Sequence, residues 1–462
     1  MKILLVNPPF CPPTMPPYSI SYLKGFLMAN LDVKVKCLDL NALFHRLRFP
    51  ELFDRLNGKD AQTDEGYALL LTELESQARP AYSFNNKKVV DGIDPEFSNE
   101  LARCILAENP DLVAFSVVYS SQCFYVPVLG KSLKEYGIPF VIGGPAVNHR
   151  LASVMPFLKD ESDFVNHIAS MQGAEIKRFN RDAASQKVLP DFSDFNAKDY
   201  LSRELVIPIK TSSTCFYQQC TFCTHFAKVP YKEYDIEAVR QTMIQSKARN
   251  FFFIDDMISK QRLLALAHAI KDLDVHWWVQ LRPTRDLLGI FDALSESGCT
   301  SICWGLESGN QRVLDLIKKG TRIADVPEIL RQSHAAGIKN TVYVMFGFPT
   351  ETKDEFLDTI NFLKDNQENL FMVSPTVFGL QKGAKVFEEP ASYGITEIRE
   401  TPRTNLGEKV EYTVASGLDK ESARRLRGRF SKTLSKMNKA PQVFKDYKEQ
   451  VLLLKSSQSG AY

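Results

Sequence analysis

Strand and helix signals alternate along most of this chain, and this alternation limits its fold more than any other feature. Residues 1–150 contain the apolar runs KILLVNPPF, VKVKCLDL, DLVAFSVVYS and PFVIGG, separated by segments with helical spacing. From residue 205 the pattern resumes with six runs: ELVIPIK, NFFFID, HWWVQL, SICWGLE, NTVYVMFGF and LFMVSPTVFGL. Strands that alternate with helices form βαβ units and a parallel sheet. The sequence therefore predicts an α/β fold.

The two blocks of alternation divide the chain into parts. We predict a Rossmann-like domain at residues 1–150, with a polar insertion at about 48–97 that is longer than an ordinary connection. Residues 151–204 are predicted to be a linker. Residues 205–382 are predicted to form a partial (β/α)6 TIM-like barrel. Residues 383–462 are a more polar C-terminal extension, with a predicted helix over KESARRLRGRFSKTLSKM.

Composition narrows the setting in which the chain works. Fifty-seven basic residues against 55 acidic residues leave a formal charge of +2, which argues against a general nucleic-acid binder. No apolar run approaches the ~20 residues of a membrane span. The nine cysteines are odd in number and lie mostly in apolar segments, which suits a reducing compartment better than a disulfide framework. We therefore expect a cytoplasmic protein.

Three of those cysteines stand close together in TSSTCFYQQCTFCTHF, residues 211–226, directly after the first barrel strand. Cys215, Cys220 and Cys223 have the spacing C-x4-C-x2-C, and His225 follows. A Cys3His set suits structural zinc. Three cysteines alone suit a 4Fe–4S cluster with one iron left open to another ligand. These residues alone are compatible with either zinc or an iron–sulfur cluster. The preferred interpretation is an iron–sulfur cluster to which His225 is not a ligand.

Polar side chains also follow the other barrel strands. In barrels of this kind the chemistry gathers at the carboxyl ends of the strands. The residues found there are Asp255, Asp256, Arg282, Glu307, Ser308, the turn GFPTET at 347–352, and Gln381. Asp, Ser and Thr also favour helix N-caps, so capping explains Asp256, Ser308 and Thr350 equally well. Glu307, inside GLESG, fits a functional role better.

The loop CFYQQCTFC and the later segments SICWGLESGNQRVLDLIKKGT, AGIKNTVYVMFGFPTET and DEFLDTINFL resemble radical S-adenosylmethionine (radical SAM) enzymes. The first gap is one residue longer than the C-x3-C-x2-C spacing best known in that family. The resemblance implies a 4Fe–4S cluster on Cys215, Cys220 and Cys223, SAM on its open iron, and a 5′-deoxyadenosyl radical. It further implies SAM contacts from Phe222, Asp256, Arg282, Glu307 and Ser308.

The segments ILLVNPP, DLVAFSVVYSS and VIGGPAVN resemble the cobalamin-binding domain that precedes the barrel in a large subgroup of this family. That resemblance implies cobalamin contacts from Ser116, Ser120, Ser121, Gly143 and Gly144. The chain has no Asp-x-His-x-x-Gly motif to coordinate cobalt, and many members of the subgroup also lack it. A retained fold with an empty or repurposed pocket is the alternative.

Together these resemblances predict a radical SAM enzyme that methylates an unactivated carbon of a peptide or natural product with the help of cobalamin. The expected partners are that substrate and an electron donor such as flavodoxin or ferredoxin, with no nucleic acid and no membrane. One alternative is a cobalamin-independent epimerase, oxidoreductase or cyclase of the same family. Another is a non-catalytic zinc-binding protein. Cys303 is expected to pack in the core, with hydrogen-atom donation as its alternative role.

Overall fold

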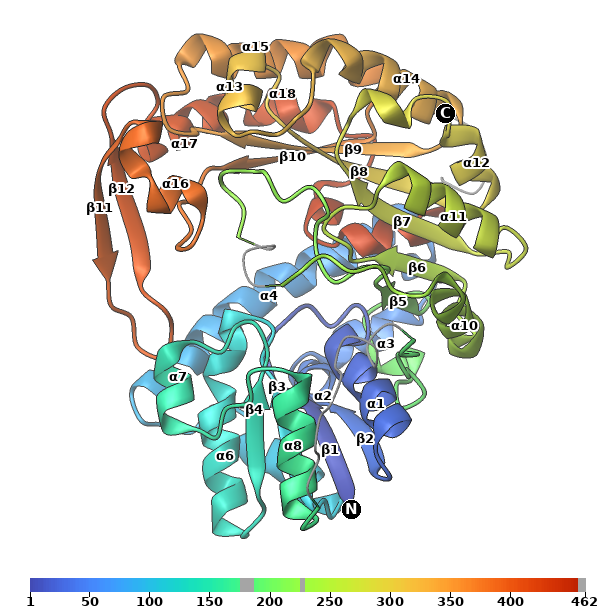
Figure 1. Ribbon diagram of the computed structural model, residues 1–462, viewed down its shortest axis with the longest axis vertical. Helices are drawn as coiled ribbons and strands as arrows, with labels where there is room; N and C mark the ends of the chain where they lie inside the picture. The colour runs from blue at the N-terminus through green and yellow to red at the C-terminus, as the bar shows by residue number, and fades with distance from the viewer. Residues whose placement is uncertain (175–186, 225–228, 456–462) are drawn as a thin grey trace. The chain divides into compact units, whose positions relative to one another are not determined.

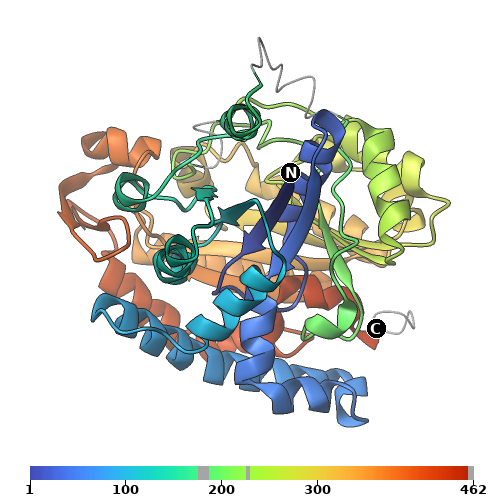
Figure 2. The ribbon, with the colours of Figure 1, turned by 90° about the horizontal axis from the view of Figure 1, so that it is seen from below.

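The computed structural model describes residues 1–174, 187–224 and 229–455 (Figures 1 and 2). The chain divides into two compact units, which we describe separately. The front unit contains Met1–Pro208, Gln241–Ala248 and Pro402–Glu408, and the barrel unit contains Ile209–Arg240, Arg249–Thr401 and Lys409–Tyr462. No helix within the described ranges is long and apolar enough to cross a membrane.

A four-stranded sheet in the order β2-β1-β3-β4 forms the centre of the front unit. The strands are β1 (Lys2–Asn7), β2 (Lys34–Asp39), β3 (Leu112–Ser116) and β4 (Phe140–Gly143), and all pair in parallel. Leu4 and Val6 enter one hydrophobic cluster, whereas Ile3 and Leu5 enter another. Because side chains alternate across a strand, both faces of β1 are buried, which explains its unbroken apolar sequence.

Helices supply both of those clusters. They are α1 (Tyr18–Asn30), α2 (Leu40–Arg48), α3 (Pro50–Leu56), α4 (Asp64–Val90), α5 (Ser98–Ala107), α6 (Tyr125–Glu135), α7 (His149–Val154) and α8 (Glu161–Met171). The predicted insertion at 48–97 is largely helical, and α4, with 27 residues, is the long blue helix of Figures 1 and 2. Within the predicted linker at 151–204, Phe164, Val165 and Ile168 of α8 pack against the sheet.

The barrel unit is built on a six-stranded open sheet in the order β10-β9-β8-β7-β6-β5, of which only Val206–Pro208, the start of β5, are counted with the front unit. The strands are β5 (Val206–Ile209), β6 (Asn250–Phe253), β7 (His276–Leu281), β8 (Cys299–Glu307), β9 (Lys339–Phe346) and β10 (Met372–Val377). Strands β6 to β10 pair in parallel, each with the next. The order of the strands follows the chain, as expected for the partial barrel. The predicted α/β fold class is confirmed.

Helices cover the outer face of this sheet (Figure 1). They are α10 (Ile236–Ser246), α11 (Lys260–Ile270), α12 (Phe291–Glu296), α13 (Gln311–Leu316), α14 (Val326–Ala335) and α15 (Lys353–Asp365). Trp277 and Trp304 point to this side, since Nε1 of Trp277 donates to Ser297 O at 2.9 Å and Trp304 contacts Phe291 of α12. Trp278 follows Trp277 and therefore faces the opposite, inner side.

The C-terminal extension mixes short helices with one hairpin. After α16 (Lys385–Glu388), β11 (Ile395–Thr401) and β12 (Lys409–Val414) pair in antiparallel fashion. The helix predicted over residues 420–437 is present as two helices, α17 (Lys420–Arg429) and α18 (Ser431–Lys436). Two 3-10 turns follow, η8 (Gln442–Lys445) and η9 (Lys448–Leu453), and η9 contacts β6, β7 and β8.

Asn340 joins several elements of the barrel unit and carries our first prediction. Its buried side chain donates to Leu330 O (2.9 Å) and Asn369 O (2.8 Å) and accepts from Trp304 Nε1 (2.8 Å). The substitution Asn340→Ala leaves all three groups without a partner, and we expect it to lower the free energy of unfolding by about 3 kcal/mol.

Urea unfolding followed by tryptophan fluorescence measures this loss, because all three tryptophans, at 277, 278 and 304, lie in the barrel unit. Lys364→Ala, at an exposed position of α15, is the control and should change little. A loss below about 0.5 kcal/mol for Asn340→Ala would show that water replaces these hydrogen bonds without cost.

Candidate active site

The three clustered cysteines lie on the loop that follows β5, and each is half-buried and outside any disulfide. Thr221, between Cys220 and Cys223, holds the loop to the rest of the unit. Its amide donates to Ile317 O at 3.0 Å, and its carbonyl accepts from Val386 N at 3.1 Å. The loop is therefore fixed at its centre by the main chain, while the cysteine side chains keep partial access to solvent.

The start of the loop is fixed by Asp255, which follows β6. This carboxylate is 3% exposed and accepts hydrogen bonds from Thr211 N (2.9 Å), Thr211 Oγ1 (3.1 Å) and Ser212 Oγ (2.7 Å). Burial raises the pKa of Asp255, and these hydrogen bonds oppose that increase. The neighbouring Asp256, which we expect to contact SAM, accepts from Thr214 Oγ1 at 3.4 Å, one residue before Cys215.

Lys319 brings together several of the residues named from the sequence. Its Nζ lies 2.8 Å from Glu307 Oε1 and 5.7 Å from the centre of the Phe222 ring, and both charged side chains are nearly buried. Burial lowers the pKa of Lys319, but the charges of Glu307 and Cys220 outweigh this and raise it overall. Burial also raises the pKa of the Cys220 thiol, and the charge of Lys319 opposes that increase. Lys319 therefore favours the thiolate that a metal requires.

Arg282 lies against the same loop. Its guanidinium carbon is 3.5 Å from the centre of the Tyr217 ring, and Nη1 donates to Lys319 O at 3.0 Å. The Tyr217 hydroxyl in turn donates to Lys318 O at 2.9 Å. Arg282 thus joins the end of β7 to both the cysteine loop and the segment that carries Lys319.

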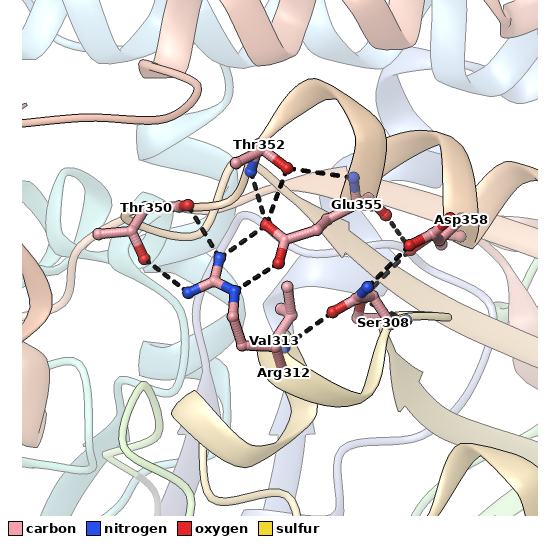
Figure 3. Close-up of polar contacts among 9 residues, drawn as sticks. Ser308, Arg312, Val313, Thr350, Thr352, Glu355 and Asp358 are labelled. Carbon is pink, nitrogen blue, oxygen red and sulfur yellow. Dashed lines mark hydrogen bonds and ion pairs between the residues drawn. The ribbon is translucent and has the colours of Figure 1, made fainter.

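Ser308 lies in a different environment from Glu307, although the two are adjacent in sequence. Its side chain is fully buried, contacts Thr359 Oγ1 at 3.2 Å and accepts from Asn310 N at 3.1 Å. Figure 3 shows the neighbouring network, in which Arg312 pairs with Glu355 (Nη2 to Oε2, 2.6 Å) and donates to Thr350 O (2.9 Å). These contacts join α13 to the start of α15. The Ser308 hydroxyl is bonded within the protein as well, and its contact with SAM stays a prediction.

The GFPTET turn after β9 contains a buried acid. Glu351 is fully buried, and Oε2 accepts from the amide of Gly347. Within the described residues its Oε1 has no hydrogen-bond partner. Burial raises the pKa of Glu351 to about 8. The folded chain therefore keeps a protonated carboxyl here at a pH where an exposed glutamate is ionised.

The front-unit residues named from the sequence lie at the carboxyl ends of β3 and β4. Ser116 Oγ donates to Ser19 Oγ at 2.9 Å, and Ser121 Oγ donates to Phe10 O at 2.6 Å, whereas Ser120 is exposed. The last contact joins the ends of β1 and β3. Because β1 lies between β2 and β3, the sheet order reverses at this point, and ligands of open parallel sheets bind at such positions.

The two glycines after β4 differ from each other. Gly144 has φ +116°, and a Cβ there would lie 2.4 Å from Val117 O, so the approach of this backbone requires glycine. A Cβ at Gly143 would meet only Leu158 O, at 3.4 Å. The need for glycine at position 144 is thus explained within the protein, without a ligand.

Three expectations from the sequence remain: the metal site, His225 and Cys303. Within the described residues, no three or more His, Cys, Asp or Glu side chains are close enough to hold a metal ion. The donor chemistry of the loop nevertheless fits an iron–sulfur cluster, since one anchored segment carries three cysteines that form no disulfide. His225 lies outside the described residues. Cys303 is fully buried, and burial raises its pKa to about 12.

Sequence reasoning missed Lys319 and gave Asp255 no role. Lys319 lies 12 residues after Glu307, in a segment with no motif that marks it as a partner of the cysteine loop. Both Asp255 and Asp256 were named at the strand end, but only Asp256 was expected to contact SAM. Burial of Asp255 is the feature that distinguishes it from Asp256. The contact of Asp255 with Thr211 and Ser212 follows from the pairing of β5 with β6. The separation of these residues in the sequence does not indicate it.

Glu351 gives a prediction of pH dependence. Its pKa rises from an ordinary value of 4.5 to about 8 on folding, so the folded state binds this proton more tightly than the unfolded state. The stabilisation is complete below the unfolded pKa and is lost as the pH rises through the folded value. Between about pH 5 and pH 8 we expect wild type to lose on the order of 1 kcal/mol or more relative to Glu351→Gln.

Urea unfolding across this pH range measures the difference. Glu368→Gln, at an exposed position, is the matched control and should follow the wild-type pH profile. Parallel profiles for wild type and Glu351→Gln would contradict the raised pKa.

Comparisons with known proteins agree with this geometry. Residues 209–363 match the model of the Radical SAM superfamily. An uncharacterized methyltransferase of Pyrococcus horikoshii is 23% identical over 342 residues, which cover 65% of this chain and 73% of that protein. The bacteriochlorophyllide d C-12(1)-methyltransferase of Chlorobaculum tepidum is 26% identical over 197 residues, which cover 38% and 42% of the two chains.

Two solved structures share the fold of the chain. The cobalamin-dependent S-adenosylmethionine radical enzyme OxsB, with aqua-cobalamin bound, has a TM-score of 0.65 at 14% identity, covering 99% of this chain and 71% of that one. The radical S-adenosylmethionine methyltransferase TsrM from Kitasatospora setae, with cobalamin and a [4Fe-4S] cluster bound, has a TM-score of 0.63 at 14% identity, covering 100% and 99%. At this identity the likeness concerns the fold, including the order of a front sheet and a barrel.

Proposed function

We propose that this chain is a cobalamin-dependent methyltransferase. Residues 209–363 match the Radical SAM superfamily, and a domain of this family implies an enzyme that uses a 4Fe–4S cluster and SAM. Its substrate would be a small molecule or a peptide, methylated at an unactivated carbon. The observation that carries the proposal is the anchored loop with three half-buried cysteines that form no disulfide, beside Glu307, Lys319 and Arg282. The relatives named as methyltransferases support the reaction class.

The residues of the barrel unit would divide the work at this rim. Cys215, Cys220 and Cys223 would hold the cluster, which supplies one electron for the cleavage of SAM. Lys319 favours the thiolate form of Cys220 and pairs with the carboxylate of Glu307. Glu307 would accept a hydrogen bond from the ammonium or hydroxyl groups of SAM. Phe222, half-buried beside Lys319, presents a ring face to which an adenine could stack.

In the front unit, the edge of the sheet between β1 and β3 would hold cobalamin, which supplies the methyl group when bound. Ser120 is exposed there and available to a ligand, while the hydroxyls of Ser116 and Ser121 are bonded within the protein. Because the hydroxyls of Ser116 and Ser121 are bonded within the protein, they favour one competing function. This is a cobalamin-independent radical SAM enzyme that performs epimerisation, oxidation or ring formation. In both cases an electron donor such as flavodoxin or ferredoxin is required, and the nine free cysteines suit the reducing cytoplasm.

The cluster is tested by reconstitution under anaerobic conditions. We expect about four irons per chain and formation of 5′-deoxyadenosine from SAM after addition of dithionite. Substitution of Cys215, Cys220 or Cys223 by alanine should abolish 5′-deoxyadenosine formation, because each removes a ligand that no other side chain replaces. Cys104→Ala removes a half-buried cysteine of the front unit and should leave it unchanged. A colourless protein with one zinc would instead support the zinc-binding alternative.

Cobalamin dependence is tested by titration with hydroxocobalamin and measurement of its visible absorption. We expect wild type to bind, and Ser120→Trp to bind at least about tenfold more weakly, because the indole would occupy the reversal point of the sheet. Ser76→Trp, at an exposed position of α4, is the control. If wild type binds no cobalamin while it still forms 5′-deoxyadenosine, the cobalamin-independent function replaces the one proposed.

A further inference from the structure

The inner face of the barrel sheet carries a second group of polar side chains, two of which, Cys303 and Tyr343, feel the charge of Glu307. Trp278 of β7 stacks on Phe252 of β6 with their centres 4.3 Å apart, on the side opposite to the helices. Cys303 and Tyr343, on β8 and β9, interact with each other. The segment η9 contacts β6, β7 and β8, so it lies next to these residues.

Lys448, the first residue of η9, extends its ammonium group into this region. Nζ donates to the Tyr343 hydroxyl at 2.8 Å. It also lies 5.6 Å from the centre of the Trp278 ring and 5.1 Å from the centre of the Tyr343 ring. The charge of Lys448 acts on the buried Cys303 thiol as well. The half-buried ammonium therefore lies beside two aromatic side chains, Trp278 and Tyr343, and within electrostatic range of the Cys303 thiol.

Lys448 has no anionic partner in the part of the chain that the structure describes. The ion pairs found there, with nitrogen and oxygen within 4.0 Å, do not include it. The adjacent Glu449 is buried and contacts Gln450 Nε2 at 3.3 Å instead. An ammonium has three N–H groups, and only the one that binds Tyr343 has a protein acceptor among the described residues.

Burying half of an ammonium group that forms no ion pair costs free energy. If the side chain of Lys448 only packed against its neighbours, no charge would be needed at this position. Methionine would pack against the same two rings without the cost of desolvating an ammonium. Cation–π contacts return only about 1 kcal/mol at partly exposed sites. The charge is better explained by a ligand that completes the pair when it binds.

We propose that Lys448 and Tyr343 recognise a carboxylate of the substrate on the inner face of the barrel. The inference rests on the proposed function, because a radical formed at the cysteine loop acts on a substrate held within the same barrel. One ammonium beside one neutral hydroxyl matches a single negative charge, whereas a phosphate dianion would retain an unpaired charge. The rings of Trp278 and Tyr343 favour an apolar body next to that carboxylate. The substrate class is therefore a carboxylic acid with an apolar or aromatic body.

The test uses a pair of probes that differ only in charge. The reconstituted full-length enzyme is titrated by calorimetry with 3-phenylpropionate and with 3-phenylpropionamide. We expect wild type to bind the carboxylate at least about tenfold more tightly than the amide, as a charge-assisted hydrogen bond implies. Lys448→Gln should remove this preference, and Lys448→Arg should keep most of it because the charge remains. Lys445→Gln, in the same segment and partly exposed, is the matched control and should bind as wild type does.

Equal binding of the two probes to wild type, binding of neither, or an unchanged preference in Lys448→Gln would overturn the inference. A folding defect in Lys448→Gln would weaken the binding of both probes, whereas loss of the charge weakens the binding of the carboxylate and leaves that of the amide unchanged. Binding is measured without turnover, so the result does not depend on methyl transfer. Formation of 5′-deoxyadenosine, measured on the same samples, reports separately on the proposed function.

Discussion

The buried carboxylate of Asp255 determines where the cysteine loop leaves the barrel sheet. It accepts hydrogen bonds from the main chain and hydroxyl of Thr211 and from the hydroxyl of Ser212, the first residues beyond β5. A carboxylate removed from water is costly unless its oxygens are satisfied, so these bonds must form together. Because β5 and β6 are neighbours, this contact connects two strand ends and gives the loop a fixed starting direction. The positions of the cysteines depend on that direction.

The second constraint is electrostatic. Lys319 carries its charge next to Cys220 and is held there by Glu307. Thiols in a buried environment resist ionisation, and a metal binds the thiolate. A nearby buried ammonium lowers the cost of removing the proton. Glu307 has φ +70°, at a point where the pairing of β8 with β9 changes register, and this irregularity turns its side chain toward Lys319. The loop and the end of β8 therefore form one electrostatic unit.

Much of the architecture was predictable from the sequence, because it depends on local patterns. Apolar runs with strand length identified β1 to β4 and all six strands of the barrel sheet, and these positions needed no knowledge of long-range contacts. The helical content of residues 48–97 was not predicted, since the buried face of α4 is interrupted by exposed Leu69 and Phe84 and has no clear period. The place of α8 against the sheet was likewise not visible in the sequence, because it depends on contacts with distant strands.

The site residues also divide into those that local sequence patterns identify and those that depend on long-range contacts. Residue type and position at a strand end were sufficient to name Glu307 and Arg282, which the structure places beside the cysteine loop. They were not sufficient to separate Ser308 from Glu307, or Asp255 from Asp256, because adjacent residues of an extended segment point in opposite directions. Partners that belong to no motif, such as Lys319 and Lys448, become visible only when distant segments are brought together.

In the front unit, few of the side chains at the edge of the sheet are available to bind a cofactor. The hydroxyls of Ser116 and Ser121 are bonded within the protein, and Gly144 is required by the approach of Val117. Side-chain recognition at this edge is thus left to a few exposed groups, among them Ser120 and the 48% exposed Tyr119. A large cofactor at the reversal point of the sheet would be held mainly by main-chain groups and apolar contact. Such a site depends on the shape of the edge more than on particular residue types, which explains why its sequence signature is weak.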